Sequence, residues 1–165
     1  MDAYDTANWV GLFGAEVAAS AALTGLIFVA VSINLQRILA YPSLPRRVLK
    51  ALGLLGLVLF VSTLGLVPGQ GSRLLGLEIL GAGLLAIISV VVLDVGTWQT
   101  TDGQYRRGLL RVFPIGLLAA LTTTVAGATL LAQAGGGLYW LVPAVVFAFL
   151  AALADAWVLL IEIVR

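Results

Sequence analysis

The chain has 165 residues, of which 61% are hydrophobic and only 10% are charged, and its mean hydropathy is +1.11. A soluble domain carries about 25% charged residues, so this chain has too few to cover a water-soluble globule. Intrinsic disorder is excluded as well, because it requires low hydrophobicity. The chain contains no Cys and no His. Their absence excludes disulfides, thiolate metal sites and every zinc, haem or catalytic site that depends on His.

Apolar runs between polar breaks predict an all-α integral membrane protein with five transmembrane helices in one bundle domain over residues 1–165. About 20 apolar residues in a helix are needed to cross a bilayer core of about 30 Å. The expected spans are approximately residues 9–38, 48–67, 74–98, 109–133 and 138–163. The runs are continuous rather than alternating, which argues against the strands of a β-barrel.

The basic residues predict how the bundle is oriented. All of the 9 Lys and Arg residues except Arg73 fall at one end of a five-helix topology, in the first loop, the third loop and the C-terminus. The positive-inside rule assigns this end to the cytoplasm. The N-terminus is then outside and the C-terminus cytoplasmic. The expected location is a cell membrane, specifically a bacterial inner membrane, crossed several times.

The first four spans show a weak internal similarity. When the second pair of helices is aligned with the first, Arg46-Arg47 corresponds to Arg106-Arg107. This favours a duplicated hairpin followed by a fifth helix, since parallel repeats occur in membrane proteins. Alternatively, the two loops are alike only because both follow the same topology rule.

Small residues recur every four positions on three of the predicted helices, and this spacing places them on one helix face. The sets are Gly14, Ala18 and Ala22; Gly116, Ala120, Thr124, Ala128 and Ala132; and Ala144, Ala148, Ala152 and Ala156. Transmembrane helices associate through such close-packing residues. The stripes predict packing inside one bundle or, for at least one stripe, a contact between subunits of a homo-oligomer.

Acidic residues inside the predicted spans are the main functional candidates, because ionisable groups in a membrane are costly and usually functional. One face of the first helix is polar, through Glu16, Ser20, Thr24 and Asn34. Glu78 lies at a similar depth to Glu16 on the third helix. Two such carboxylates predict a cation or proton site, since hard cations prefer oxygen ligands. Alternatively, Glu78 pairs with Arg73, or each acid is protonated and hydrogen-bonded to a helix.

A second group of charges is expected near the cytoplasmic boundary. Asp94 and Asp155 lie there, and Asp155 should face protein because it shares the small-residue side of its helix. Arg37 is the expected partner of one of them, in a structural salt bridge or, alternatively, at a gate or ion exit. The basic residues of the loops serve as topology signals or bind anionic lipid head groups; besides Arg37 they include Arg46, Arg47, Arg106 and Arg107.

The leading functional hypothesis is a homo-oligomeric channel or transporter for a small cation or a proton. Its path would be lined by Glu16, Ser20, Thr24, Asn34, Glu78, Asp94 and Asp155. The alternative is an accessory or scaffold subunit that transports nothing and binds partner transmembrane helices. We find no signature of a membrane enzyme and expect no cofactor or metal. The expected partners are membrane lipids, further copies of the chain or another membrane protein; nucleic acid is not expected without a soluble basic domain.

Overall fold

The computed structural model describes residues 2–100 and 106–158, with side chains described at neither residue 2 nor residues 106–112. Two short 3-10 helices, η1 (Asp2–Tyr4) and η2 (Thr6–Trp9), precede six α-helices and a third 3-10 helix. These are α1 (Val10–Ile33), α2 (Leu35–Ala40), α3 (Leu44–Gly65), α4 (Ser72–Thr100), α5 (Arg106–Ala132), η3 (Gly137–Trp140) and α6 (Leu141–Trp157). The described part of the chain contains no strand, so the all-helical prediction is confirmed.

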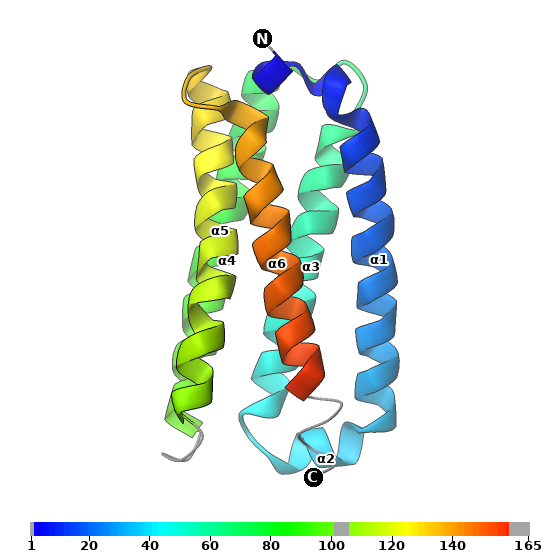
Figure 1. The fold of residues 1–165 in the computed structure, drawn as a ribbon, viewed down its shortest axis with the longest axis vertical. Coiled ribbons are helices and arrows are strands. Elements are labelled where there is room, and N and C mark those ends of the chain that lie inside the picture. The colour runs from blue at the N-terminus through cyan, green and yellow to red at the C-terminus, as the bar shows by residue number, and fades with distance from the viewer. Residues whose placement is uncertain (1, 101–105, 159–165) are drawn as a thin grey trace.

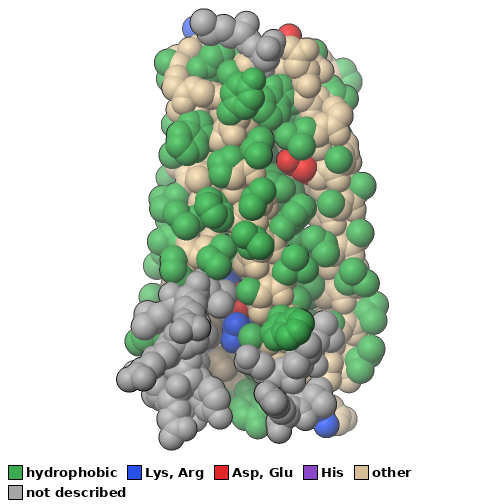
Figure 2. All heavy atoms as spheres, viewed as in Figure 1, with side chains coloured by type: hydrophobic (Ala, Val, Ile, Leu, Met, Phe, Trp, Pro, Cys, Tyr) green, Lys and Arg blue, Asp and Glu red, His purple; other side chains and the backbone are tan. Residues whose placement is uncertain are grey.

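Five of the helical segments in the described residues are long and apolar enough to cross a membrane. They are Thr6–Ile33, Leu44–Gly65, Ser72–Thr100, Phe113–Ala132 and Gly137–Trp157. Figure 2 shows hydrophobic side chains spread over the described part of one face of the bundle, with backbone between them and charged atoms at only a few points. A surface of this kind suggests a multi-pass membrane protein.

The five long helices run up and down, side by side (Figure 1). α3 and α6 lie in the middle of the bundle, the pair α4 and α5 lies on one side, and α1 lies on the other. α1 packs mainly against α3, whereas α4 packs mainly against α5 and then α3. This order matters for the polar residues, because α1 and α4 share no substantial interface.

Two helix boundaries differ from the sequence prediction at the end of the bundle that carries α2. The first predicted helix, residues 9–38, is interrupted at Asn34, whose backbone leaves the helical region at φ −107° and ψ 15°. The second helix begins at Leu44 rather than near residue 48, with Pro45 in its first turn. Proline is tolerated there because its missing N–H would have no partner inside the helix. We call this end of the bundle the basic end, since Arg46 and Arg47 lie on these first turns of α3.

α4 and α5 approach each other so closely that their contact requires glycine. A Cβ atom added at Gly76 would lie 2.6 Å from the backbone nitrogen of Leu131, and one added at Gly127 would lie 2.3 Å from the backbone nitrogen of Leu80. At Gly83 it would meet Thr124 of the predicted α5 stripe. Close backbone contact through small residues is how helices associate in lipid, so α4 and α5 form a tightly fixed pair.

The opposite end of the bundle is closed by the N-terminal segment. The backbone N–H of Gly136 donates a hydrogen bond to the hydroxyl oxygen of Tyr4 at 3.1 Å. The rings of Trp9 and Tyr139 meet edge to face with their centroids 4.9 Å apart. Gly136 has a φ of 112°, which a residue with a side chain rarely adopts. The turn between α5 and α6 therefore provides the surface on which η1 and η2 lie.

Candidate functional site

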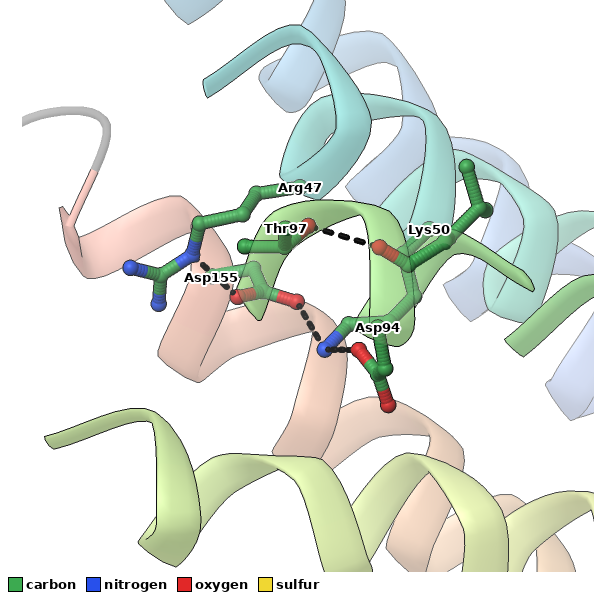
Figure 3. A network of polar contacts seen from close by, with 6 residues as sticks. Arg47, Lys50, Asp94, Thr97 and Asp155 are labelled. Atoms are coloured by element: carbon green, nitrogen blue, oxygen red, sulfur yellow. Dashed lines mark hydrogen bonds and ion pairs between the residues drawn. The ribbon is translucent and has the colours of Figure 1, made fainter. Parts of the chain in front are cut away.

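Charged side chains from α3, α4 and α6 meet in one buried cluster near the basic end (Figure 3). The Nζ atom of Lys50 lies 2.9 Å from Oδ1 of Asp94 and 3.2 Å from Oδ2 of Asp155. The Nε atom of Arg47 lies 2.8 Å from Oδ1 of Asp155. The side chains of Lys50 and Asp155 are 2% and 0% exposed. We call these four residues the charge cluster.

The charge cluster is balanced, with two cations against two carboxylates. Moving charges out of water is expensive, and close opposite charges with good geometry offset that cost. Lys50 has a further favourable contact, because its Nζ atom lies 5.1 Å from the centroid of the Phe113 ring on α5. The cluster therefore joins α3 to α4 and α6 and carries no net charge of its own.

A second polar contact joins α3 to α4 just beyond the cluster. Arg46 donates to the backbone carbonyl of Gly96 and to the hydroxyl of Thr100, the latter at 3.1 Å. Both partners are neutral. Arg46 and Arg47 thus point to different neighbouring helices although they are adjacent in sequence. Thr97, which is labelled in Figure 3, donates its hydroxyl to the carbonyl of Leu93 in its own helix.

The predicted pairing of Arg37 with Asp94 or Asp155 is wrong. Arg37 is exposed on α2, and the described cations that reach the two carboxylates are Lys50 and Arg47. The prediction that Asp155 faces protein is confirmed, because this residue is fully buried. The side chains of the other two predicted cations, Arg106 and Arg107, lie outside the part of the chain whose side chains are described.

Glu16 forms a separate polar site in the other half of the bundle. Its carboxylate accepts a hydrogen bond of 2.8 Å from the hydroxyl of Ser62, which joins α1 to α3. Glu16 is 6% exposed and Ser62 is 0% exposed. A small cavity of about 10 Å³ adjoins them, lined also by Thr123 of α5 and Ala144 of α6. One water molecule needs about this volume.

The other polar residues predicted along the first helix bond within that helix. The hydroxyl of Ser20 donates to the carbonyl of Val17 at 3.2 Å, and that of Thr24 donates to the carbonyl of Ser20 at 2.7 Å. The side-chain amide of Asn34 donates to the carbonyl of Ala30 at 3.1 Å. Each of these side chains thus donates a hydrogen bond to a nearby backbone carbonyl, which is the usual way in which a helix in lipid accommodates Ser and Thr.

Glu16 and Glu78 are not neighbours in the fold. Glu78 lies on α4 and accepts a hydrogen bond from the side-chain amide of Gln70, in the turn between α3 and α4. Glu16 lies on α1, on the far side of α3. The expected two-carboxylate site is therefore not assembled within one chain. Among the described residues, no group of three or more Asp, Glu, His or Cys side chains is placed to hold a metal ion.

An apolar layer separates the Glu16 site from the charge cluster. The α3 side chains that are buried between Lys50 and Ser62 are Ala51, Leu54, Leu55, Val58 and Val61. The two sites are twelve residues apart on α3, or about 18 Å at a rise of 1.5 Å per residue. Within the described part of one chain, the polar groups therefore form two sites rather than a continuous path.

The chain matches no known protein-family model, and no match to it was found among curated proteins or solved structures.

Proposed function

We propose that this chain is a multi-pass membrane protein that binds transmembrane helices, as an accessory or scaffold subunit, with the outer face of α1 as its contact surface. A second copy of the chain is the first partner to test. The observation that carries the proposal is a stripe of small residues on α1 that is exposed along its length. The stripe consists of Gly11, Gly14, Ala18, Ala22 and Gly25.

The α1 stripe lies opposite the side on which α1 packs against the rest of the chain. The buried residues of α1 are Phe13, Glu16, Ser20, Ile27 and Ala30, and with 3.6 residues per turn the small residues fall on the other side. A Cβ atom added at Gly11, Gly14 or Gly25 would meet nothing within 4 Å. Small residues let a neighbouring helix approach closely, so this face is shaped for a helix that the chain does not itself supply.

Part of each of the other two stripes packs against helices of the same chain. On α6, Ala144, Ala148 and Ala152 are buried in the bundle. On α5, Ala120 is buried and Thr124 contacts α4 at Gly83. Exposed positions on the other helices include larger residues, such as Leu84 and Leu85 on α4. The α1 stripe is thus the one whose members are exposed throughout, which supports an intermolecular role.

The polar sites also favour helix binding over transport. The charge cluster is neutralised within the chain, and Glu16 is bonded to Ser62 across an interface inside the subunit. The apolar layer between them contains Leu55, which is fully buried. An ion crossing one subunit would have to leave oxygen ligands at this layer, which is costly in a low-dielectric interior.

The proposal is tested by cross-linking from α1. Since the chain has no Cys, Ala18→Cys provides one reactive site on the stripe. We expect disulfide-linked dimers of the chain, or a cross-link to another membrane protein, when membranes are oxidised or treated with a bifunctional reagent. Adding Ala22→Leu should reduce the cross-link because the larger side chain separates the helices.

The matched control is Ala128→Leu, which adds the same side chain at an exposed position of α5. This control should leave the cross-link at Ala18→Cys unchanged. If Ala18→Cys is linked to no membrane protein, or if Ala22→Leu and Ala128→Leu reduce the cross-link equally, helix binding by the α1 stripe is refuted.

A pathway for a small cation or a proton is the second candidate function. The observation that favours it is a buried carboxylate, Glu16, that lies beside a hydroxyl and a cavity with the volume of about one water molecule. Such an intramembrane acid is a typical element of a proton relay. Two chains joined through α1 would place two copies of this site in one assembly.

Ion flux into liposomes tests the second candidate. Wild-type protein should carry cations or protons, and Glu16→Gln should abolish the flux while keeping the size and the hydrogen-bonding capacity of the side chain. Glu78→Gln is the comparison, because Glu78 bonds to Gln70 near the end of the bundle rather than to Ser62. If the wild type shows no ion flux, or if the flux through Glu16→Gln equals that of the wild type, the transport hypothesis fails.

A further inference from the structure

A groove on the outside of the bundle follows the contact between α3 and α4. It has a volume of about 240 Å³ and is lined almost entirely by apolar groups. Small residues, Gly53 on α3 and Ala82, Ala86 and Ser89 on α4, form part of its lining, with Phe60 at one end and the side chain of Lys50 at the other. Gly53, Phe60 and Ser89 are exposed, so the groove opens to the surroundings of the bundle.

The length of the groove matches half of a bilayer. From Lys50 to Phe60 is ten residues of α3, or about 15 Å at a rise of 1.5 Å per residue. The hydrocarbon core of a bilayer is about 30 Å thick, so one leaflet contributes about 15 Å. A groove of this length beginning near the basic end fits an extended acyl chain from the leaflet on that side, whereas a transmembrane helix would continue through the other leaflet.

Arg46 lies at the basic end of the same seam. It precedes Lys50 by four residues, so both belong to the α3 face that bears Gly53 and Phe60. Its guanidinium crosses to α4, where it donates to the carbonyl of Gly96 and the hydroxyl of Thr100. Arg46 is half-buried and its described partners are neutral. Its charge is therefore available to a phosphate at the head-group level, whereas Lys50 is neutralised by Asp94 and Asp155.

We propose that the α3–α4 groove binds one anionic phospholipid, with an acyl chain between Gly53 and Phe60 and the phosphate at Arg46. The groove supplies the apolar contact, and Arg46 supplies the preference for an anionic head group. This inference rests on the membrane location proposed above but not on helix binding by α1.

Native mass spectrometry of the protein released from nanodiscs tests the inference. The nanodiscs contain equal amounts of phosphatidylcholine and phosphatidylglycerol, and incorporation into them is checked first, so that a missing lipid is not confused with a failure to enter the bilayer. The wild type should retain one phosphatidylglycerol in preference to phosphatidylcholine. Gly53→Leu should lose that lipid, because a Cβ atom there meets nothing within 4 Å and the added side chain projects into the groove without a clash.

Gly81→Leu is the matched control. Gly81 is exposed on α4 and does not line the groove, and a Cβ atom added there also meets nothing within 4 Å. This variant should retain phosphatidylglycerol as the wild type does. Arg46→Gln should lower the preference for phosphatidylglycerol about fivefold, as expected for one basic residue at a membrane surface, and Arg46→Lys should preserve it.

Three results would overturn the inference. The first is equal retention of the two lipids by the wild type, and the second is retention of phosphatidylglycerol by Gly53→Leu at the level of Gly81→Leu. The third is a cross-link from Gly53→Cys to another polypeptide in membranes, which would mean that a partner helix occupies the groove. Loss of cross-linking from Ala18→Cys on α1 would leave the lipid result unchanged, because α1 does not line the groove.

Discussion

The guanidinium of Arg47 lies 2.8 Å from the carboxylate of Asp155, although 108 residues separate them in the chain. This contact joins the first turns of α3 to the last turns of α6. Lys50 approaches the same carboxylate at 3.2 Å and also contacts Asp94 on α4. One buried carboxylate therefore forms ion pairs with two cations. Without it, the positive charges of Arg47 and Lys50 would be less well neutralised.

Asp155→Asn is expected to lower the free energy of unfolding by about 3–5 kcal/mol, the usual cost of removing one partner from a buried ion pair. The substitution keeps the shape of the side chain, so the loss would come from the charge. Thermal unfolding in detergent or a denaturant titration measures it. Asp5→Asn is the control, because Asp5 is exposed and the described groups that donate to its carboxylate are those of nearby Ala7 and Asn8. Equal stability of the two variants would contradict a stabilising role for the charge cluster.

Lys50 and Asp94 are expected to be energetically coupled. Lys50→Met leaves Asp94 without its close cation, so this single variant should be destabilised. Lys50→Met with Asp94→Asn removes both charges of that pair and leaves the contact of Arg47 with Asp155 in place. A neutral replacement of a whole buried pair is often tolerated, so the double variant should be more stable than the sum of the single losses predicts. A double-mutant cycle should give a coupling of about 0.5–3 kcal/mol, and additive losses would show that the pair is not coupled.

The charged layer at the basic end can be predicted from the sequence only in part. The positions of Asp94 and Asp155 within their predicted spans put both residues near this end. The small residues around Asp155 predict that it faces protein, as the structure shows. The partner cations are harder to predict, because hydropathy assigns Arg47 and Lys50 to a loop or its edge. α3 in fact begins at Leu44, and this earlier start places both cations on helical turns that face α4 and α6. The proline in the first turn of α3 is the available signal, since proline often marks a helix start.

The Glu16 site shows a different limit of the sequence. Depth along a helix follows from residue number, and Glu16 and Glu78 do lie within helices long and apolar enough to span a membrane. Whether two residues at one depth meet depends on which helices are neighbours, and hydropathy contains no such information. α1 packs against α3, so the partner of Glu16 is Ser62. The suggested duplication of the helical hairpins stays a prediction.

Gly127→Ala is expected to destabilise the bundle by about 1–3 kcal/mol, the typical cost of overpacking a tight contact. A Cβ atom at this position would lie 2.3 Å from the backbone nitrogen of Leu80, so α4 and α5 would have to separate. Gly81→Ala is the matched control: a Cβ atom there meets nothing within 4 Å, and Ala favours a helix over Gly. In denaturant titrations, Gly127→Ala should therefore lower the free energy of unfolding and Gly81→Ala should not. Equal effects of the two variants would mean that the α4–α5 contact is not tight.

The orientation of the bundle is expected to follow its basic residues, with the α2 end in the cytoplasm. The absence of Cys makes this directly measurable. Ala40→Cys places a thiol on the exposed end of α2, and Gly71→Cys places one in the exposed turn between α3 and α4 at the opposite end. In intact cells an impermeant maleimide should label Gly71→Cys, whereas Ala40→Cys should react only after the membrane is permeabilised. Labelling of Ala40→Cys alone in intact cells would reverse the orientation, and equal labelling of both would contradict a single topology. The same experiment bears on the lipid groove, because its basic end lies on the side of Ala40 and would then face the cytoplasmic leaflet.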